Sequence, residues 1–218
     1  MSNSTHFKMP ALALLAFIGL FLEILLASLE KHLYGTDIAG FSEMQYIRHW
    51  QITSALWAIA SFLVVFLSKR LCEFNVFESH IVPSRLQLVL GLSLPLVFAV
   101  VWSILNGGPG IVRFYKNSSI AMSIWQYIYY VFEMLLAGLI ICFSQKSFDS
   151  RVGKQSQIPW GGLMLGLSWG LLHYFTKGSA VVAAIAFILA ILFGMVFNWL
   201  GKDLKKTLPL MYLMFVCL

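Results

Sequence analysis

Charged residues are scarce in this chain. Only 11% of its 218 residues are Asp, Glu, Lys or Arg, whereas 60% are hydrophobic, and the mean hydropathy is +0.83. A soluble domain of this length has too small an interior to bury that much apolar surface. The composition therefore excludes a soluble globular protein and indicates an integral membrane protein surrounded by the lipid bilayer.

Cysteines are also few. Cys72, Cys142 and Cys217 have neither a paired spacing nor a metal-ligand spacing. We therefore expect no disulfide, no metal site and no cofactor.

The net charge of +6 does not indicate nucleic-acid binding, because the basic residues lie between the apolar stretches.

Long apolar stretches dominate what is present. Helices need about 20 apolar residues to cross about 30 Å of hydrocarbon. Five stretches meet this requirement: 10–29, 51–68, 86–106, 121–143 and 178–200. A sixth, 160–176, is shorter, and the apolar tail 208–218 is too short to span alone. The sequence thus predicts an all-α, polytopic transmembrane bundle of about six spans plus a short apolar C-terminal segment, in one domain over 1–218.

The ends and connections of these spans carry further signals. The first span is not a cleavable signal peptide, because it contains Glu23 and lacks a small-residue cleavage site. The mixed segment 31–50 predicts a helix lying at the membrane interface. The run Gly107-Gly108-Pro109-Gly110 predicts a loop at the start of 107–120, and not a phosphate-binding loop, because no Lys-Ser/Thr follows.

Basic residues are distributed unevenly between the two sides of the predicted bundle. Ten lie on one side: Lys8, Lys69, Arg70, Arg85, Lys146, Arg151, Lys154, Lys202, Lys205 and Lys206. Five lie on the other: Lys31, Arg48, Arg113, Lys116 and Lys177. Since cytoplasmic loops are enriched in Lys and Arg, this pattern predicts a plasma-membrane protein with a cytoplasmic N-terminus.

Glycines recur every four residues on the shortest span, at Gly162, Gly166 and Gly170. A stripe of small residues lets another helix approach closely, and close packing alone is its simplest explanation. A closely packed helix also holds its side chains in fixed positions, as a functional site requires.

Glu133 and His173 are the main candidates for a functional site. A charge at the centre of the hydrocarbon costs from about 3 to more than 10 kcal/mol, so such residues usually have a role or a partner. Glu133 lies roughly 15 Å above the predicted inner end of its helix, and His173 roughly 20 Å along the next, at 1.5 Å per residue. Their side chains are therefore expected at similar depths.

A carboxylate and an imidazole at one depth have the chemistry to activate a water molecule. Glu133 would be the general base, and His173 would orient the water or stabilise the developing oxyanion. Other polar and aromatic side chains share their helix faces or their depth. The supporting residues that we expect around them are Gln126, Tyr129, Tyr130, Trp169 and Glu23.

Structural roles remain open for each of these groups. Glu133 in its protonated form could bond a neighbouring helix, and His173 could reach interfacial water. Glu23 is either the true partner of His173 or a structural group. Asn198 lies near a helix end and is expected to be a polar terminus rather than a ligand.

Two segments resemble motifs of the CAAX protease and bacteriocin-processing (CPBP) family of intramembrane endopeptidases, which includes the Rce-type prenyl-protein proteases. The stretch Trp169-Gly-Leu-Leu-His173 resembles the family motif Phe-x-x-x-His, with Trp in place of Phe. The stretch Glu133-Met-Leu-Leu-Ala-Gly138 resembles part of the motif Glu-Glu-x-x-x-Arg. The resemblance covers about 121–218.

The resemblance implies that Glu133 activates water and that His173 positions it. Three family features are absent: the second glutamate, the Arg of the first motif, and the third motif, His-x-x-x-Asn or Asp, whose expected place in 207–218 holds none of these residues. Losing one oxyanion donor typically costs about 100- to 1000-fold in rate.

Three functions follow from these residues. The first is an intramembrane endopeptidase that cleaves a membrane-proximal peptide. The second is a non-catalytic relative that binds a peptide, a bacteriocin or a partner membrane protein, as an immunity or scaffold protein. The third is a small transporter or channel subunit, for which no inverted repeat or pair of broken helices is found.

Overall fold

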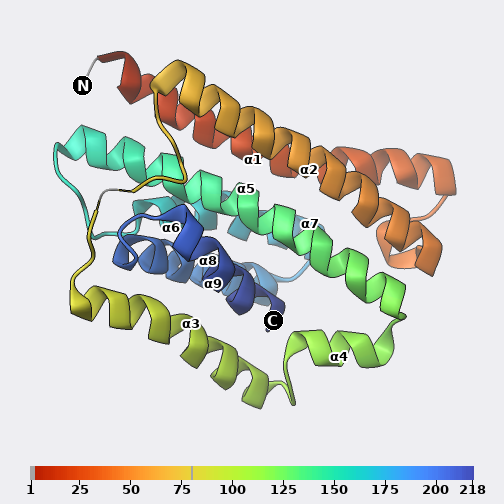
Figure 1. The fold of residues 1–218 in the computed structure, drawn as a ribbon. Helices are drawn as coiled ribbons and strands as arrows, with labels where there is room; N and C mark the ends of the chain where they lie inside the picture. Colours follow the sequence, from red (N-terminus) through yellow and green to blue (C-terminus); the bar gives the residue numbers. More distant parts are fainter. Residues whose placement is uncertain (1–2, 80) are drawn as a thin grey trace.

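Helices connected by short turns form the fold (Figure 1). The computed structural model describes residues 3–79 and 81–218, and this part of the chain contains no strand. Its elements are α1 (Asn3–Tyr34), η1 (Ile38–Gly40), α2 (Glu43–Cys72), α3 (Arg85–Leu105), α4 (Gly110–Asn117), α5 (Ile120–Val152), α6 (Trp160–Leu165), η2 (Gly166–Gly170), α7 (Leu171–Lys177), α8 (Ala180–Trp199) and α9 (Leu204–Val216). The predicted all-α class is confirmed.

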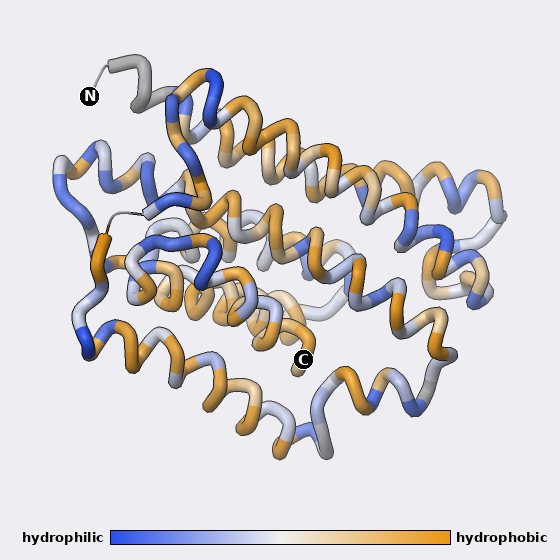
Figure 2. The backbone as a smooth tube through the Cα atoms, in the orientation of Figure 1, coloured by the Kyte–Doolittle hydropathy of each residue, from blue (hydrophilic) through white to orange (hydrophobic). Residues whose placement is uncertain are grey.

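Five helices of the described residues are long and apolar enough to cross a membrane. They are Lys8–Tyr34, Glu43–Cys72, Arg85–Leu105, Ile120–Val152 and Ala180–Trp199. These spans coincide with the five long stretches predicted from hydropathy. Figure 2 shows the same pattern, with hydrophobic residues along the rods and hydrophilic residues gathered at the turns.

Local hydrogen-bonding signals set where several helices begin and end. Ser42 and Gln45 form a reciprocal capping box at the start of α2, and Ser84 and Gln87 form another at the start of α3. Gly153, with φ of 70°, ends α5 in the left-handed conformation that favours glycine. These caps satisfy backbone groups that would otherwise be unpaired at the helix ends.

Helix α5 runs through the middle of the bundle (Figure 1). The hairpin of α1 and α2 packs on one side of α5, whereas α6 and α9 pack on the other, with α8 against α6, η2 and α7. In the most apolar part of α5, 67% of the residues are buried inside the protein. In the corresponding part of α3, only 11% are buried. Polar side chains on α5 are therefore placed inside the protein, away from lipid.

The prediction of an interfacial helix at 31–50 is wrong. Its first residues complete α1, which ends before Gly35 with φ of 70°, and after η1 the chain starts α2 at Glu43. The cause is the capping box at Ser42, which begins the span eight residues before the apolar stretch that starts at 51. His49 is consequently buried in the bundle instead of lying at its surface.

The short segment 160–176 is helical but is interrupted. Helices α6 and α7 continue one another through the π-helical turn η2, so the segment is not a single regular α-helix. The predicted close approach at its glycines is confirmed. A Cβ atom on Gly162 would lie 2.6 Å from the carbonyl oxygen of Ala190 in α8, and one on Gly170 would lie 2.9 Å from the Cα of Phe187.

Two smaller predictions are refined by the structure. The predicted loop at 107–120 begins as expected, with positive φ at Gly107 and Gly108, and then forms the short helix α4. Asn198, expected to be a polar helix terminus, lies buried near the end of α8. Its Nδ2 donates to the carbonyl oxygens of Gln157 and Ile158, at 3.1 and 3.2 Å, and so fixes the entry to α6.

Candidate functional site

Glu133 bonds directly to the segment that carries His173. The indole Nε1 of Trp169 donates to Oε1 of Glu133 at 2.9 Å. Both side chains are buried, with exposed fractions of 6% for Glu133 and 4% for Trp169. The contact joins α5 to the π-helical turn η2, so two motif-like segments 36 residues apart meet at one depth in the bundle.

His173 lies beside Trp169 and is half-buried. Its Nδ1 donates to the backbone carbonyl oxygen of Trp169 at 2.8 Å, and the two rings meet edge to face with centroids 4.6 Å apart. When Nδ1 carries the proton, Nε2 is left as an acceptor. Trp169 therefore contacts both candidate residues: its indole donates to Oε1 of Glu133, and its backbone carbonyl accepts from His173.

An aromatic ring lies where the resemblance would place the third motif. Phe215 on α9 packs against Trp169, with ring centroids 5.8 Å apart, and against Tyr130, at 4.8 Å. Helix α9 spans Leu204–Val216 and contains no His, Asn or Asp. A phenylalanine cannot donate a hydrogen bond to an oxyanion, so Phe215 supplies only packing against Trp169 and Tyr130.

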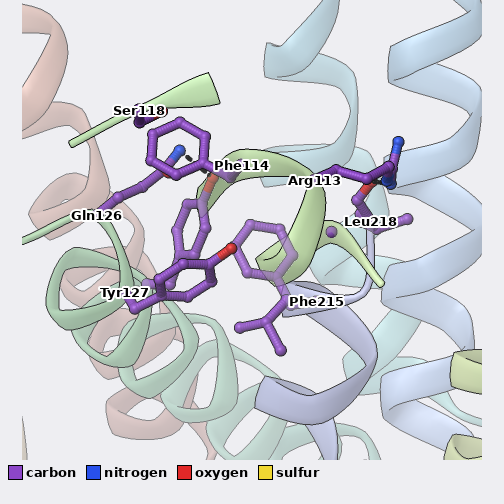
Figure 3. Close-up of a pocket in the computed structure, with 10 residues that line it drawn as sticks. Arg113, Phe114, Ser118, Gln126, Tyr127, Phe215 and Leu218 are labelled. Atoms are coloured by element: carbon purple, nitrogen blue, oxygen red, sulfur yellow. Dashed lines mark hydrogen bonds between the residues drawn. The ribbon is translucent and has the colours of Figure 1, made fainter. Parts of the chain in front are cut away.

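Gln126 and Tyr130 belong to a neighbouring pocket of about 420 Å³ (Figure 3). Gln126 Nε2 donates to the Tyr130 hydroxyl at 2.8 Å. The pocket combines aromatic rings with the polar side chains of Arg113, Ser118 and Gln126. The residues that define it here are Phe114, Tyr127, Tyr130, Phe215, Arg113 and Gln126.

Arg113 lies at one edge of this pocket (Figure 3). It donates to the backbone carbonyl oxygen of Leu218 at 2.6 Å, and Trp102 Nε1 donates to the same oxygen at 3.4 Å. Donors from α4 and α3 therefore meet at the backbone oxygen of Leu218 at this edge of the pocket.

Tyr129 and Glu23 contact each other. The Tyr129 hydroxyl donates to Oε1 of Glu23 at 2.7 Å. The same carboxyl oxygen lies 3.6 Å from Nε2 of His49, whose Nδ1 lies 2.6 Å from Oε2 of Glu30. The alternative that Glu23 is the direct partner of His173 is therefore not the arrangement found. Its partners are Tyr129 and His49.

Glu30 and His49 were not predicted as site residues. Both fall in or beside the segment interpreted as interfacial, so their burial was hidden by the wrong start of α2. One signal was available: Glu23 and Glu30 are seven residues apart, which places both on one face of a helix. Pairing them with His49 required knowledge of the α1–α2 hairpin.

Hydrolysis at Glu133 would require particular groups around its carboxyl group. A general base must reach a water, and the oxyanion needs preorganised donors. The donor found on Glu133 itself is the Trp169 indole, and Phe215 packs against that indole. Among the described residues, no group of three or more His, Cys, Asp or Glu side chains is arranged to hold a metal ion.

Comparison with known proteins gives no match: no protein-family model, no curated protein and no solved structure resembles this chain closely enough to be matched.

Proposed function

We propose that this chain is an integral membrane protein of the CPBP type that binds a membrane-active or membrane-proximal peptide without cleaving it. In this proposal Glu133, Trp169 and His173 derive from a hydrolytic site and now serve as an internal contact. The observation that carries it is the hydrogen bond from Trp169 to Glu133, made by an indole that also packs against Phe215.

Two features support the relation to the CPBP type. The partial motif at Glu133 and the motif at Trp169–His173 lie on different elements, yet their side chains are in direct contact. The close backbone packing of α6 against α8 fixes the position of the second motif. Short motifs that meet in space are better evidence of a shared site than the same motifs in sequence.

The chemistry of the site supports binding over cleavage. Removal of one oxyanion donor costs about 100- to 1000-fold in rate, and this chain lacks the Arg of the first motif and the whole third motif. Tyr129, which could have substituted as a donor, is engaged by Glu23. Tyr130 accepts a hydrogen bond from Gln126 and packs on Phe215.

The pocket beside Phe215 supports a peptide as the ligand. Its aromatic rings offer apolar contact, and Gln126 presents a buried acceptor oxygen that has no hydrogen-bond partner. Such an acceptor is satisfied when a ligand N–H binds to it. A bacteriocin or another peptide at the membrane surface has both apolar side chains and backbone N–H groups. The site would then belong to an immunity or scaffold protein of the plasma membrane.

The direct test uses purified protein in lipid nanodiscs and a library of synthetic amphipathic peptides. We expect binding by the unmodified protein. Tyr127→Ala should weaken binding about tenfold or more, because it removes a ring from the pocket wall. Leu96→Ala, on the exposed face of α3, is the matched control and should bind as the unmodified protein does.

Equal binding by the Tyr127 and control variants would rule out this pocket as the peptide site. Peptide fragments produced by the unmodified protein and absent with Glu133→Gln would replace the proposal with the intramembrane endopeptidase.

A further inference from the structure

A second pocket, of about 360 Å³, lies near the end of α5, whereas the pocket beside Phe215 lies near its start. It forms where α5 meets the segment that follows α2 and the turn that follows α8. Its volume is in the range of small-molecule sites, roughly 300–1,000 Å³. We call it the polar pocket, and the residues that define it here are Glu73, Phe74, Glu78, Lys146, Asp149 and Lys202.

Buried polar contacts hold one wall of the polar pocket in place. Lys202 forms an ion pair with Asp149, and only 10% and 12% of these side chains are exposed. The other oxygen of Asp149 accepts from Gln145 Nε2 at 3.1 Å and from the backbone N–H of Ser156 at 3.0 Å. Gln145 in turn accepts from the backbone N–H of Gly161 at 3.1 Å. This wall is therefore rigid before any ligand binds, as a binding site requires.

The other charged groups of the polar pocket are not paired with one another. The ammonium of Lys146 lies 5.5 Å from the ring centroid of Phe74 and forms no hydrogen bond or ion pair with any described residue. The carboxyl group of Glu73 has no such partner in the described chain either. Glu78 accepts a hydrogen bond from Asn75. One ammonium and two carboxylates can therefore bind a ligand.

The backbone of the polar pocket carries a second signal. Among the residues that the structure describes, two that are not glycine have positive φ, Glu73 at 51° and Lys202 at 57°, and both line this pocket. This conformation is unfavourable for L-residues, and glycine is the usual residue where a helix ends in it, as α2 does at Glu73. The ion pair with Asp149 accounts for Lys202, whereas no side-chain contact accounts for Glu73. Residues held in such conformations cluster at functional sites.

The polar pocket lies where two apolar helices end. Helix α2 ends at Cys72, directly before Glu73, and α8 ends at Trp199, just before the turn that carries Lys202. The connection that leaves α2 crosses the last turns of α5 (Figure 1), where Phe74 and Phe143 pack with ring centroids 6.2 Å apart. The ends of membrane-spanning helices lie at the level of the lipid headgroups.

The charges of the polar pocket select the class of ligand. Three carboxylates stand against two ammonium groups, which disfavours an anionic headgroup and favours one that carries both signs of charge. We propose that this pocket binds a phosphoethanolamine group, the headgroup of an ethanolamine phospholipid. The phosphate contacts Lys146, and the primary ammonium, with three N–H donors, contacts Glu73 and Glu78. This site does not depend on peptide binding, which uses the pocket near the start of α5.

Native mass spectrometry of the delipidated protein in detergent micelles tests the proposal. The probes are phosphatidylethanolamine, phosphatidylcholine, phosphatidylglycerol and water-soluble phosphoethanolamine. We expect phosphatidylethanolamine to bind about tenfold or more tightly than phosphatidylcholine, whose methylated ammonium cannot donate to a carboxylate, and than phosphatidylglycerol, which has no ammonium. Equally tight binding of phosphoethanolamine would assign a soluble ligand of the same chemistry. Weaker binding of it would assign the lipid.

Substitutions locate the binding. Lys146→Met and Glu73→Gln should each weaken binding of phosphatidylethanolamine about tenfold or more. Glu73→Gly should weaken it as much without lowering the melting temperature, because glycine adopts positive φ without strain. A purely structural role for Glu73 predicts unchanged binding in both of its variants. Lys205→Met removes an exposed lysine outside the pocket and is the matched control.

Equal affinity for the three lipids would overturn the proposal, because it would reflect only the lipid that surrounds any membrane protein. Tighter binding of phosphatidylglycerol would also overturn it, since the pocket would then bind an anion alone. Unchanged binding by Lys146→Met and Glu73→Gln would place the lipid elsewhere. If Lys146→Met does not fold, the two variants of Glu73, which is exposed, decide the question.

Discussion

Replacing Trp169 by Phe tests whether the indole contact with Glu133 supports the fold. The substitution keeps an aromatic ring but removes the Nε1–H that donates to Glu133 at 2.9 Å. A buried acceptor left without its donor costs about 1–3 kcal/mol, and more if it is charged. The smaller ring leaves a void that costs about 1 kcal/mol more. We expect a total loss of about 2–4 kcal/mol in the free energy of unfolding.

Trp57→Phe is the matched control for this prediction. Trp57 is also buried, but its Nε1 has no protein partner, so the substitution creates a similar void without breaking a direct hydrogen bond. Its expected cost is about 1 kcal/mol. Glu133→Gln should be nearly neutral, since the amide keeps an acceptor oxygen for the indole. The double variant Trp169→Phe with Glu133→Met should recover stability, because no buried acceptor is left unpaired.

Unfolding in mixed detergent and denaturing micelles, followed by circular dichroism, measures these differences. Equal losses for the Trp169 and Trp57 variants would show that the hydrogen bond to Glu133 contributes nothing measurable. The single variants Trp169→Phe and Glu133→Met are measured beside the double variant. If the double variant loses as much stability as the two single variants added together, the two side chains do not interact.

Two further predictions concern packing and orientation. Gly162→Ala should destabilise by about 1–3 kcal/mol and by more than Gly166→Ala, because its Cβ meets the backbone of α8 whereas the nearest atoms at Gly166 belong to the movable ring of Phe187. Thermal unfolding in detergent compares them, and an equal effect would contradict the backbone contact. In a background without native cysteines, Lys154→Cys should react with a membrane-impermeant thiol reagent only from the cytoplasmic side and Lys116→Cys only from outside. Reaction from the opposite sides would reverse the proposed orientation.

Hydropathy was enough to locate the five long spans because lipid requires long apolar helices. The close approach along α6 also followed from sequence, since Gly162 and Gly170 can pack against a backbone only if they lack side chains. Counting residues along the helices predicted similar depths for Glu133 and His173, whereas the contact found joins Glu133 to Trp169, and α5 extends to Val152, beyond its predicted end. When two helices lie side by side, residues at the same level remain neighbours even if the predicted ends of the helices are wrong.

The remaining features depended on tertiary packing. His49 lies in the mixed segment that predicted an interfacial helix, and the capping box at Ser42, which begins α2 before it, was not part of that prediction. Its pairing with Glu30 arises only when the α1–α2 hairpin closes. The position of Phe215 beside Trp169 is set by how α9 docks on α5, and no local pattern in the sequence encodes that contact.

The central claim is that Glu133 no longer activates water. The most direct measurement incubates the purified protein with the peptide library in water enriched in heavy oxygen and examines all peptide carboxyl ends by mass spectrometry. The account predicts bound, intact peptides and no heavy oxygen in new carboxyl ends. Heavy oxygen in new ends, present with the unmodified protein and absent with Glu133→Gln, would contradict it and identify Glu133 as a hydrolytic base.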